Sequence, residues 1–443
     1  MDFQNSWLAR WLAPRANSLI FSAYAIVAAF STYLSMYGFR KPYTAGTFEG
    51  LVDLPGPLPE LSYKSVLIIS QVFGYCTSKF LGIKIISEMD AKKRALAILV
   101  CIAIAWGALA LFAVTPAPYN AIWLFVNGLP LGMIWGLVFG FLEGRRVTEA
   151  LGAGLSASYI VASGFVKTVA RWLMDAGVSE FWMPFATGAV FALPMLFFVF
   201  LLANLPPPNE EDERLRTKRA PMDGAARKAF FKRYFTGLTA LTALYVLLTA
   251  FRGFRDDFAV EIWAELGYGG KPSILTTAEL WVAFGVMIAL GFLMTIKDNR
   301  KALITVHVLM LVGTALVGGS TLLFQAGVLD PKWWMITVGL GLYLAYVPYG
   351  CVLFDRLIAA MGSVANAGFM IYVTDAFGYL GNVGLLVWKD LGFAKLSWLE
   401  FFTGFSYVTA VVCTSLFVVS LIYFARLTRP TGGDAPTPTP QVA

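Results

Sequence analysis

The chain of 443 residues is 58% hydrophobic and only 14% charged, whereas about a quarter charged is usual for a soluble domain. This composition excludes a soluble globular protein and indicates a polytopic membrane protein that has the lipid bilayer as its main partner. The formal net charge of +7 is attributed to basic loops on one face of the membrane, so no nucleic-acid partner is expected.

Twelve apolar segments are long enough to cross a bilayer as helices, which takes about 20 residues each. Helices are predicted because lipid cannot satisfy exposed backbone groups, and the segments lack the alternation of a barrel strand. The predicted fold class is therefore an all-α polytopic membrane protein. The segments are approximately 18–45, 62–87, 94–115, 119–142, 148–175, 184–204, 234–256, 274–296, 302–326, 333–360, 364–389 and 399–425.

A long polar stretch divides these segments into six and six. It begins with prolines and acidic residues, turns basic, and ends in a stretch that suits an amphipathic helix on the membrane surface. The predicted domains are an amphipathic interfacial segment (1–16), a six-helix bundle (17–204), a cytoplasmic central loop (205–233), a second six-helix bundle (234–427) and a disordered tail (428–443). Basic loops stay cytoplasmic, so we expect both termini in the cytoplasm of a bacterial-type inner membrane.

The two halves resemble each other. Phe39-Arg40 ends the first apolar segment and Phe251-Arg252 ends the seventh, 212 positions later. Gly128-Leu129 and Gly341-Leu342 recur at an offset of 213. A weak internal repeat around a central linker is typical of a two-half transporter with its pathway between the halves.

Arg40 and Arg252 are the central candidates for substrate binding. A cation at membrane depth is costly and usually functional, and two at matching places predict one shared site. The alternative is that each side chain extends to the membrane interface. Lys41 points about 100° away from Arg40 around the helix, so we expect it to matter less.

Further charged side chains lie within the predicted spans. Lys79 lies deep in the second segment, Lys167 and Arg171 share a face of the fifth, and Arg255 lies one turn beyond Arg252. These cations predict an anionic substrate, although Lys167 and Arg171 also suit the outer interface. Asp375 suits a coupling or gating acid, or a structural ion pair, and Arg171 is a second candidate for coupling or gating. Tyrosines interleaved with the cations are candidates to bond a polar substrate: Tyr43, Tyr75, Tyr159 and Tyr346.

Nothing in the sequence predicts an enzyme, a cofactor or a metal site. No nucleophile stands near a base, and the glycine-rich runs lie inside predicted spans. His307 is the only histidine, which favours a packed role over metal binding. The four cysteines lie in apolar segments and lack a Cys-x-x-Cys spacing, so we interpret them as small core residues.

The layout resembles the major facilitator superfamily. Tyr37-Gly-Phe-Arg40-Lys41 and Tyr75-Cys-Thr-Ser-Lys79-Phe resemble motifs of its organophosphate:phosphate antiporters, the glycerol phosphate transporter group. That resemblance implies twelve helices in two six-helix pseudo-repeats, with phosphate held by Arg40, Lys79 and either Arg252 or Arg255. It also implies a gating role for Asp90 in the loop after the second segment. The Phe-Arg-Lys-Pro motif is similar to that of uncharacterised facilitator-like bacterial membrane proteins.

The sequence thus predicts a secondary transporter for a small anionic solute, either a phosphorylated or a carboxylated metabolite. The resemblance to the antiporter group implies inorganic phosphate as the exchange partner. The histidine that the antiporter group carries on its fifth helix has no equivalent here, and the group's loop signature is present only in a degraded form over 82–94. The alternatives are a proton-coupled transporter of another polar metabolite and a sensor or scaffold that does not transport. We expect a monomer.

Overall fold

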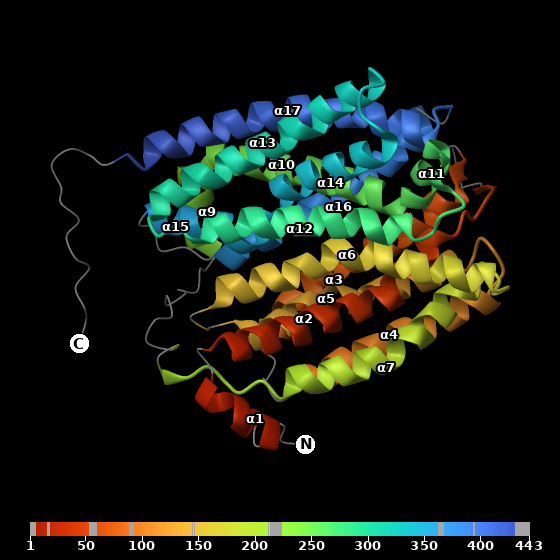
Figure 1. The fold of residues 1–443 in the computed structure, drawn as a ribbon, viewed down its shortest axis with the longest axis horizontal. Coiled ribbons are helices and arrows are strands. Elements are labelled where there is room, and N and C mark those ends of the chain that lie inside the picture. The colour runs from red at the N-terminus through yellow and green to blue at the C-terminus, as the bar shows by residue number, and fades with distance from the viewer. Residues whose placement is uncertain are drawn as a thin grey trace.

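The structure is a computed structural model, and long helices dominate it (Figure 1). The residues that it describes are 6–15, 18–52, 60–87, 93–143, 145, 147–210, 212, 224–361, 367–392 and 395–429. Residues 211 and 213–223 of the predicted central loop and most of the predicted C-terminal tail therefore lie outside the described residues.

Two groups of six long segments form the molecule, as the sequence predicts. The N-terminal half contains α2 (Leu19–Arg40), α3 (Tyr63–Ser87), α4 (Arg94–Val114), α5 (Ala121–Leu142), α6 (Thr148–Asp175) and α7 (Met183–Ala203). The C-terminal half contains α10 (Phe235–Asp257), α12 (Ile274–Met294), α13 (Asn299–Gln325), a composite fourth segment, α16 (Ala367–Gly392) and α17 (Trp398–Leu427). The composite segment consists of α14 (Pro331–Pro348), the π-helical turn η6 (Tyr349–Leu353) and α15 (Phe354–Met361). Figure 1 shows the halves side by side, with α6 and α12 at their boundary.

Ten of these segments, in the described part of the chain, are long and apolar enough to cross a membrane. The other two predicted spans correspond to α3 and α16, which are 25 and 26 residues long. Within them, the Lys79 and Asp375 side chains turn toward the interior of the protein. α3 and α16 thus bring charged side chains to the space between the halves.

Short elements connect the long helices. At the face where α7 and α17 end and α10 begins, called here the terminal face, lie α1 (Trp7–Leu12), η2 (Ala13–Arg15) and α9 (Gly224–Arg233). At the opposite face lie η3 (Pro42–Ala45), the antiparallel pair β1 (Leu51–Val52) and β2 (Leu61–Ser62), α11 (Ala259–Trp263) and the π-helical turn η5 (Ala264–Tyr268). The predicted first span therefore ends at Arg40, because Pro42 begins a separate 3-10 turn.

The amphipathic segment predicted at the N-terminus contains α1, which lies beside the end of α7 (Figure 1). Ser6 caps α1 and donates a hydrogen bond to the Asn204 side chain. Leu12 is buried, whereas Trp7 is 73% exposed. One face of α1 thus packs on the protein and the other suits a membrane interface.

Close approach of the two halves depends on Gly164 in α6. A Cβ atom at this position would lie 2.8 Å from the carbonyl carbon of Leu275 in α12 and 3.1 Å from Cγ of Glu279. Ordinary van der Waals contact begins at 3.4 Å. The two helices thus touch backbone to backbone at this point, and only glycine permits that spacing.

Candidate functional site

A cavity of about 590 Å³ lies between the two halves near the middle of the long helices. Both halves contribute side chains to it, and most are aromatic or charged. The lining residues are Tyr33, Tyr37, Arg40, Tyr75, Lys79, Trp135, Ser156 and Tyr159 of the N-terminal half, and Tyr245, Arg252, Tyr346, Gly350, Asp375 and Tyr379 of the C-terminal half.

Arg40 enters the cavity from the last turn of α2. Its guanidinium carbon lies 3.8 Å from the ring centroid of Tyr75 and 5.6 Å from that of Tyr37. Aromatic faces hold a guanidinium group by cation–π attraction without neutralising it. The side chain is buried, and its Nε has no hydrogen-bond partner among the described residues. Arg40 therefore keeps its positive charge and its hydrogen-bonding capacity for the cavity.

Arg252 enters the cavity from α10 on the other side. Its guanidinium carbon lies 4.7 Å from the ring centroid of Tyr346, and its Nε also has no hydrogen-bond partner in the described part of the chain. The Tyr346 ring is held in turn by Tyr245, through stacked rings and a hydroxyl–hydroxyl contact of 2.9 Å. Each half thus contributes to the same cavity an arginine whose guanidinium group packs on a tyrosine ring.

Lys79 and Asp375 form an ion pair between the halves at the same cavity, with 3.4 Å between Nζ and Oδ2. Tyr245 donates a hydrogen bond to Asp375. The lining therefore contains three cations and one carboxylate. Arg40 and Arg252 have no carboxylate partner among the described residues, so the cavity carries an excess of positive charge.

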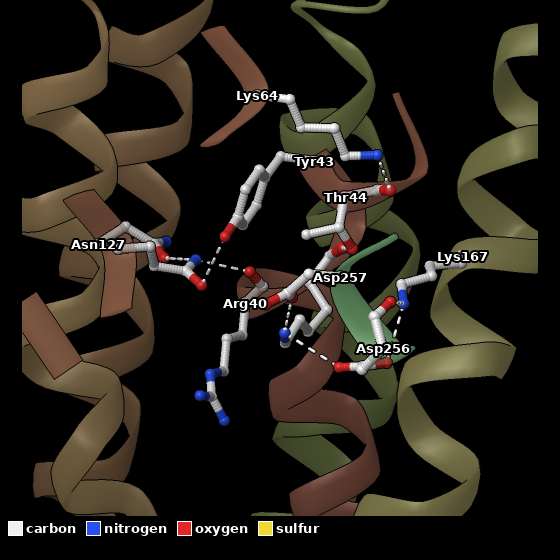
Figure 2. Close-up of polar contacts among 10 residues, drawn as sticks. Arg40, Tyr43, Thr44, Lys64, Asn127, Lys167, Asp256 and Asp257 are labelled. Atoms are coloured by element: carbon white, nitrogen blue, oxygen red, sulfur yellow. Dashed lines mark hydrogen bonds and ion pairs between the residues drawn. The ribbon is translucent and has the colours of Figure 1, made fainter. Parts of the chain in front are cut away.

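A second group of charges joins the halves between the cavity and the opposite face, and we call it the opposite-face cluster. Lys41 contacts Asp256 at 3.0 Å and also pairs with Asp257. Lys167 contacts the other oxygen of Asp256 at 2.9 Å, as Figure 2 shows. The opposite-face cluster also contains the ion pair between Lys64 of α3 and Glu261 of α11. All three lysines belong to the N-terminal half and all three acids to the C-terminal half.

Lys41 has a structural role that the sequence did not suggest. It is buried and holds two carboxylates of the other half, while the expectation that it matters less than Arg40 for binding stays a prediction. Figure 2 shows the Arg40 guanidinium group directed away from Asp256 and Asp257. The turn of about 100° between Arg40 and Lys41 thus sends one cation into the cavity and the other into the cluster.

The structure brings seven of the predicted site residues to one cavity: Arg40, Tyr75, Lys79, Tyr159, Arg252, Tyr346 and Asp375. Four others are absent from its described lining, namely Tyr43, Lys167, Arg171 and Arg255. Tyr43 lies in η3 and donates to Gln71 at 3.2 Å. Lys167 is held by Asp256, and Arg171 lies a turn farther along α6, toward the opposite face.

Arg255 lies outside the central cavity because Glu279 of α12 holds it, with 2.8 Å between Nη1 and Oε1. Arg252 is thus the arginine of α10 that faces the cavity. The position of Asp90, predicted to act in gating, lies outside the described residues. The binding and coupling roles of all these side chains remain predictions.

Sequence reasoning missed Glu279, an acid inside the predicted eighth span. A single carboxylate in an apolar helix was a signal in the sequence that pointed to a buried partner. It also missed Tyr33, Tyr245 and Tyr379, which lack a motif of their own and are recognised only from the assembled cavity. It also did not single out the acids at positions 256, 257 and 261, which the structure pairs with lysines of the N-terminal half.

His307 and the cysteines occupy packed positions, as the sequence suggests. His307 contacts the carbonyl oxygen of Leu303 at 2.8 Å and the hydroxyl of Ser420 at 3.0 Å, which joins α13 to α17. All four cysteines are free and buried.

Two six-helix halves around a central cavity are the fold of the major facilitator superfamily, and solved structures with that fold match nearly the whole chain. Residues 42–427 match the model of a family of unknown function (DUF5690), and the chain belongs to this family. A comparison with curated protein sequences found no match.

Three of the similar solved structures are transporters of different solutes. A D-xylose–proton symporter has 15% identity and a TM-score of 0.61, covering 90% of this chain and 97% of its own. A bacterial homologue of the human drug peptide transporters PepT1 and PepT2 has 14% identity and a TM-score of 0.58, with coverages of 92% and 99%. The human organic anion transporter MFSD10 (TETRAN) has 14% identity and a TM-score of 0.53, with coverages of 91% and 99%.

Proposed function

We propose that the protein is a secondary transporter that moves a small organic anion, a phosphorylated or carboxylated metabolite, by alternating access. One observation carries this proposal: Arg40 and Arg252, one from each half, line the same buried cavity without a carboxylate partner in the described part of the chain. Lys41, Lys64, Lys167 and Arg255, by contrast, all have acidic partners. A buried charge without a counter-ion is costly, so an anionic substrate is the expected partner of the two arginines.

The geometry supports a clamp that works across the boundary between the halves. An anion between the two arginines draws both halves toward it, because guanidinium groups bind carboxylate or phosphate through paired hydrogen bonds. Release to the opposite face requires the halves to separate there, which breaks the ion pairs of the opposite-face cluster. The basic loops at the terminal face favour the cytoplasm on that side. Exchange for inorganic phosphate, in a monomer of the inner membrane, completes the proposal.

The test is binding of phosphorylated and carboxylated metabolites to the purified protein, followed by Arg40→Ala and Arg252→Ala. Each loses a charge-assisted bond in a desolvated site, worth about 1.5–3 kcal/mol, so affinity should fall roughly ten- to a hundredfold. The double variant should lose less than the sum, because the two side chains share one ligand. Arg426→Ala, at an exposed arginine of α17, is the control. Unchanged affinity in both single variants contradicts the clamp.

Proton-coupled transport is the second candidate, and Asp375 supports it. This carboxylate lies in the cavity, accepts from Tyr245 and pairs with Lys79 of the other half. Protonation of Asp375 neutralises the carboxylate and removes its ion pair with Lys79. Protonation is thereby coupled to the contact between the halves. Asp375→Asn should abolish proton-driven uptake into liposomes but spare phosphate exchange. Loss of both activities, or of neither, contradicts this division of roles.

A further inference from the structure

A second, smaller cavity lies beside the opposite-face cluster. It is narrow and is lined by α6 of one half and by α10, α11, α12 and α14 of the other. Its charged lining residues are Lys167, Arg255, Asp256 and Glu279, and Tyr343 stands among them. Because both halves form its walls, this cavity widens when the halves separate at the opposite face.

The second cavity repeats the arginine and tyrosine of the central cavity. Arg252 and Arg255 are three residues apart on α10, and Tyr346 and Tyr343 are three residues apart on α14. The two helices run in opposite directions, so Arg252 lies level with Tyr346, and Arg255 with Tyr343. The C-terminal half thus presents the same pair of residue types at two successive levels, the inner one to the central cavity and the outer one to the second cavity.

A carboxylate distinguishes the two levels. The inner arginine has no acidic partner in the described structure, whereas Arg255 is bound by Glu279. That pairing is incomplete, because Oε2 of Glu279 and Nε of Arg255 both lack a hydrogen-bond partner among the described residues. Their side chains are only 12% and 4% exposed. Buried polar atoms normally have hydrogen-bond partners. The Glu279 carboxylate thus binds Arg255 but leaves part of the hydrogen-bonding capacity of the guanidinium group unused.

We propose that the second cavity is an anion subsite between the opposite face and the central cavity, occupied at rest by the Glu279 carboxylate. A carboxylate, sulfonate or phosphate group that enters from the opposite face replaces Glu279 on Arg255, and then moves one helical turn inward to Arg252. The subsite is closed while Lys167 holds Asp256 and Gly164 packs on Leu275. This role of Arg255 rests on the proposed transport of an organic anion.

The experiment measures the electrostatic preference of the cavity directly. Ala259 lines the cavity, and the Ala259→Cys variant places a reactive thiol there. The probes are the anionic sulfonatoethyl and the cationic trimethylammonioethyl methanethiosulfonate, applied to detergent-purified protein so that both faces are accessible. The readout is the ratio of their modification rates at the introduced thiol by mass spectrometry, with the unsubstituted protein as background for the four native cysteines.

Glu279→Gln, made in the Ala259→Cys protein, should raise the anion-to-cation rate ratio at least about tenfold, because it leaves Arg255 without its counter-charge in a poorly solvated site. Arg255→Gln should lower the ratio by a similar factor, and it tests the proposal even where Glu279→Gln does not fold. Glu265→Gln is the matched control. That acid lies on η5 at the same face and accepts from the backbone of Trp398. Its substitution should change the ratio less than about twofold.

Three results overturn the subsite: an unchanged ratio in Glu279→Gln, an unchanged ratio in Arg255→Gln, or no reaction of the introduced thiol with either reagent. The experiment is separable from the test of transport, because it involves no substrate. Loss of anion binding in Arg40→Ala with an unchanged rate ratio rejects the subsite alone. A shifted ratio with unimpaired binding in Arg40→Ala and Arg252→Ala rejects the central clamp alone.

Discussion

Substituting Gly164 by alanine should force the halves apart at the opposite face. The added methyl carbon would lie 2.8 Å from the carbonyl carbon of Leu275, and the carbonyl oxygen is closer still. Moving that carbonyl carbon to ordinary contact at 3.4 Å takes a shift of 0.6 Å, and clearing the carbonyl oxygen takes a larger one. The obstacle is backbone, so no rotamer change relieves it. Overpacking of this kind costs about 1–3 kcal/mol, which shifts a two-state equilibrium about 5- to 150-fold.

The assay is a distance measurement between spin labels on the two halves at the opposite face. Leu51 and Val328 are 67% and 72% exposed, and both tolerate a labelled cysteine once the four native cysteines are replaced by alanine. Gly164→Ala should increase the population with longer distances between the labels. No change in the distance distribution, in a protein of unchanged thermal stability, refutes the reasoning.

Two other glycines provide matched controls for this substitution. A Cβ at Gly128 of α5 would lie 2.8 Å from the amide nitrogen of Tyr75 in α3, so the clash falls within one half. Gly128→Ala should therefore lower thermal stability without lengthening the distance between the halves. Gly107 has open space around it, and Gly107→Ala should change neither quantity.

Other predictions concern stability and topology. Lys64→Met leaves Glu261 without its buried cation, so it should lower the thermal unfolding midpoint in detergent more than the double variant Lys64→Met/Glu261→Gln does. An equal decrease of the midpoint in both variants contradicts a coupled pair. His307→Ala removes two hydrogen bonds and leaves a void between α13 and α17, and a loss below about 1 kcal/mol in unfolding experiments contradicts its packed role. Reporters fused after Val442 and within 206–221 should report one side of the membrane, and a reporter within 53–59 the other; matching signals contradict the twelve-helix topology.

Local sequence was sufficient to predict the long helices. About 20 apolar residues are needed to cross the hydrocarbon core, and that requirement sets where each segment begins and ends. The prediction was least accurate where a proline follows a span, because Pro42 starts a separate turn and the first helix ends at Arg40 instead of near residue 45. The charges of α3 and α16 did not disturb it, since both spans were predicted with Lys79 and Asp375 inside them.

The site was predictable only in part. Arg40 and Arg252 stand out because cations at membrane depth are costly, and the structure places both in one cavity. The partner of Lys41 is Asp257, 216 positions away, and no local pattern fixes how the halves align. The same reason explains why Lys167 was read as a cavity residue. Its orientation depends on where Asp256 lies, which is a property of the assembled halves.

The separation of charge in the opposite-face cluster has a consequence for biogenesis. The ribosome delivers the N-terminal half first, with Lys41, Lys64 and Lys167, while their acidic partners lie at 256, 257 and 261 of the chain still to be made. Until α10 and α11 arrive, these lysines lack those counter-ions and reach toward lipid headgroups or water. Insertion of the second half then supplies the acids that neutralise these lysines. The cluster therefore also makes each half depend on the other for assembly.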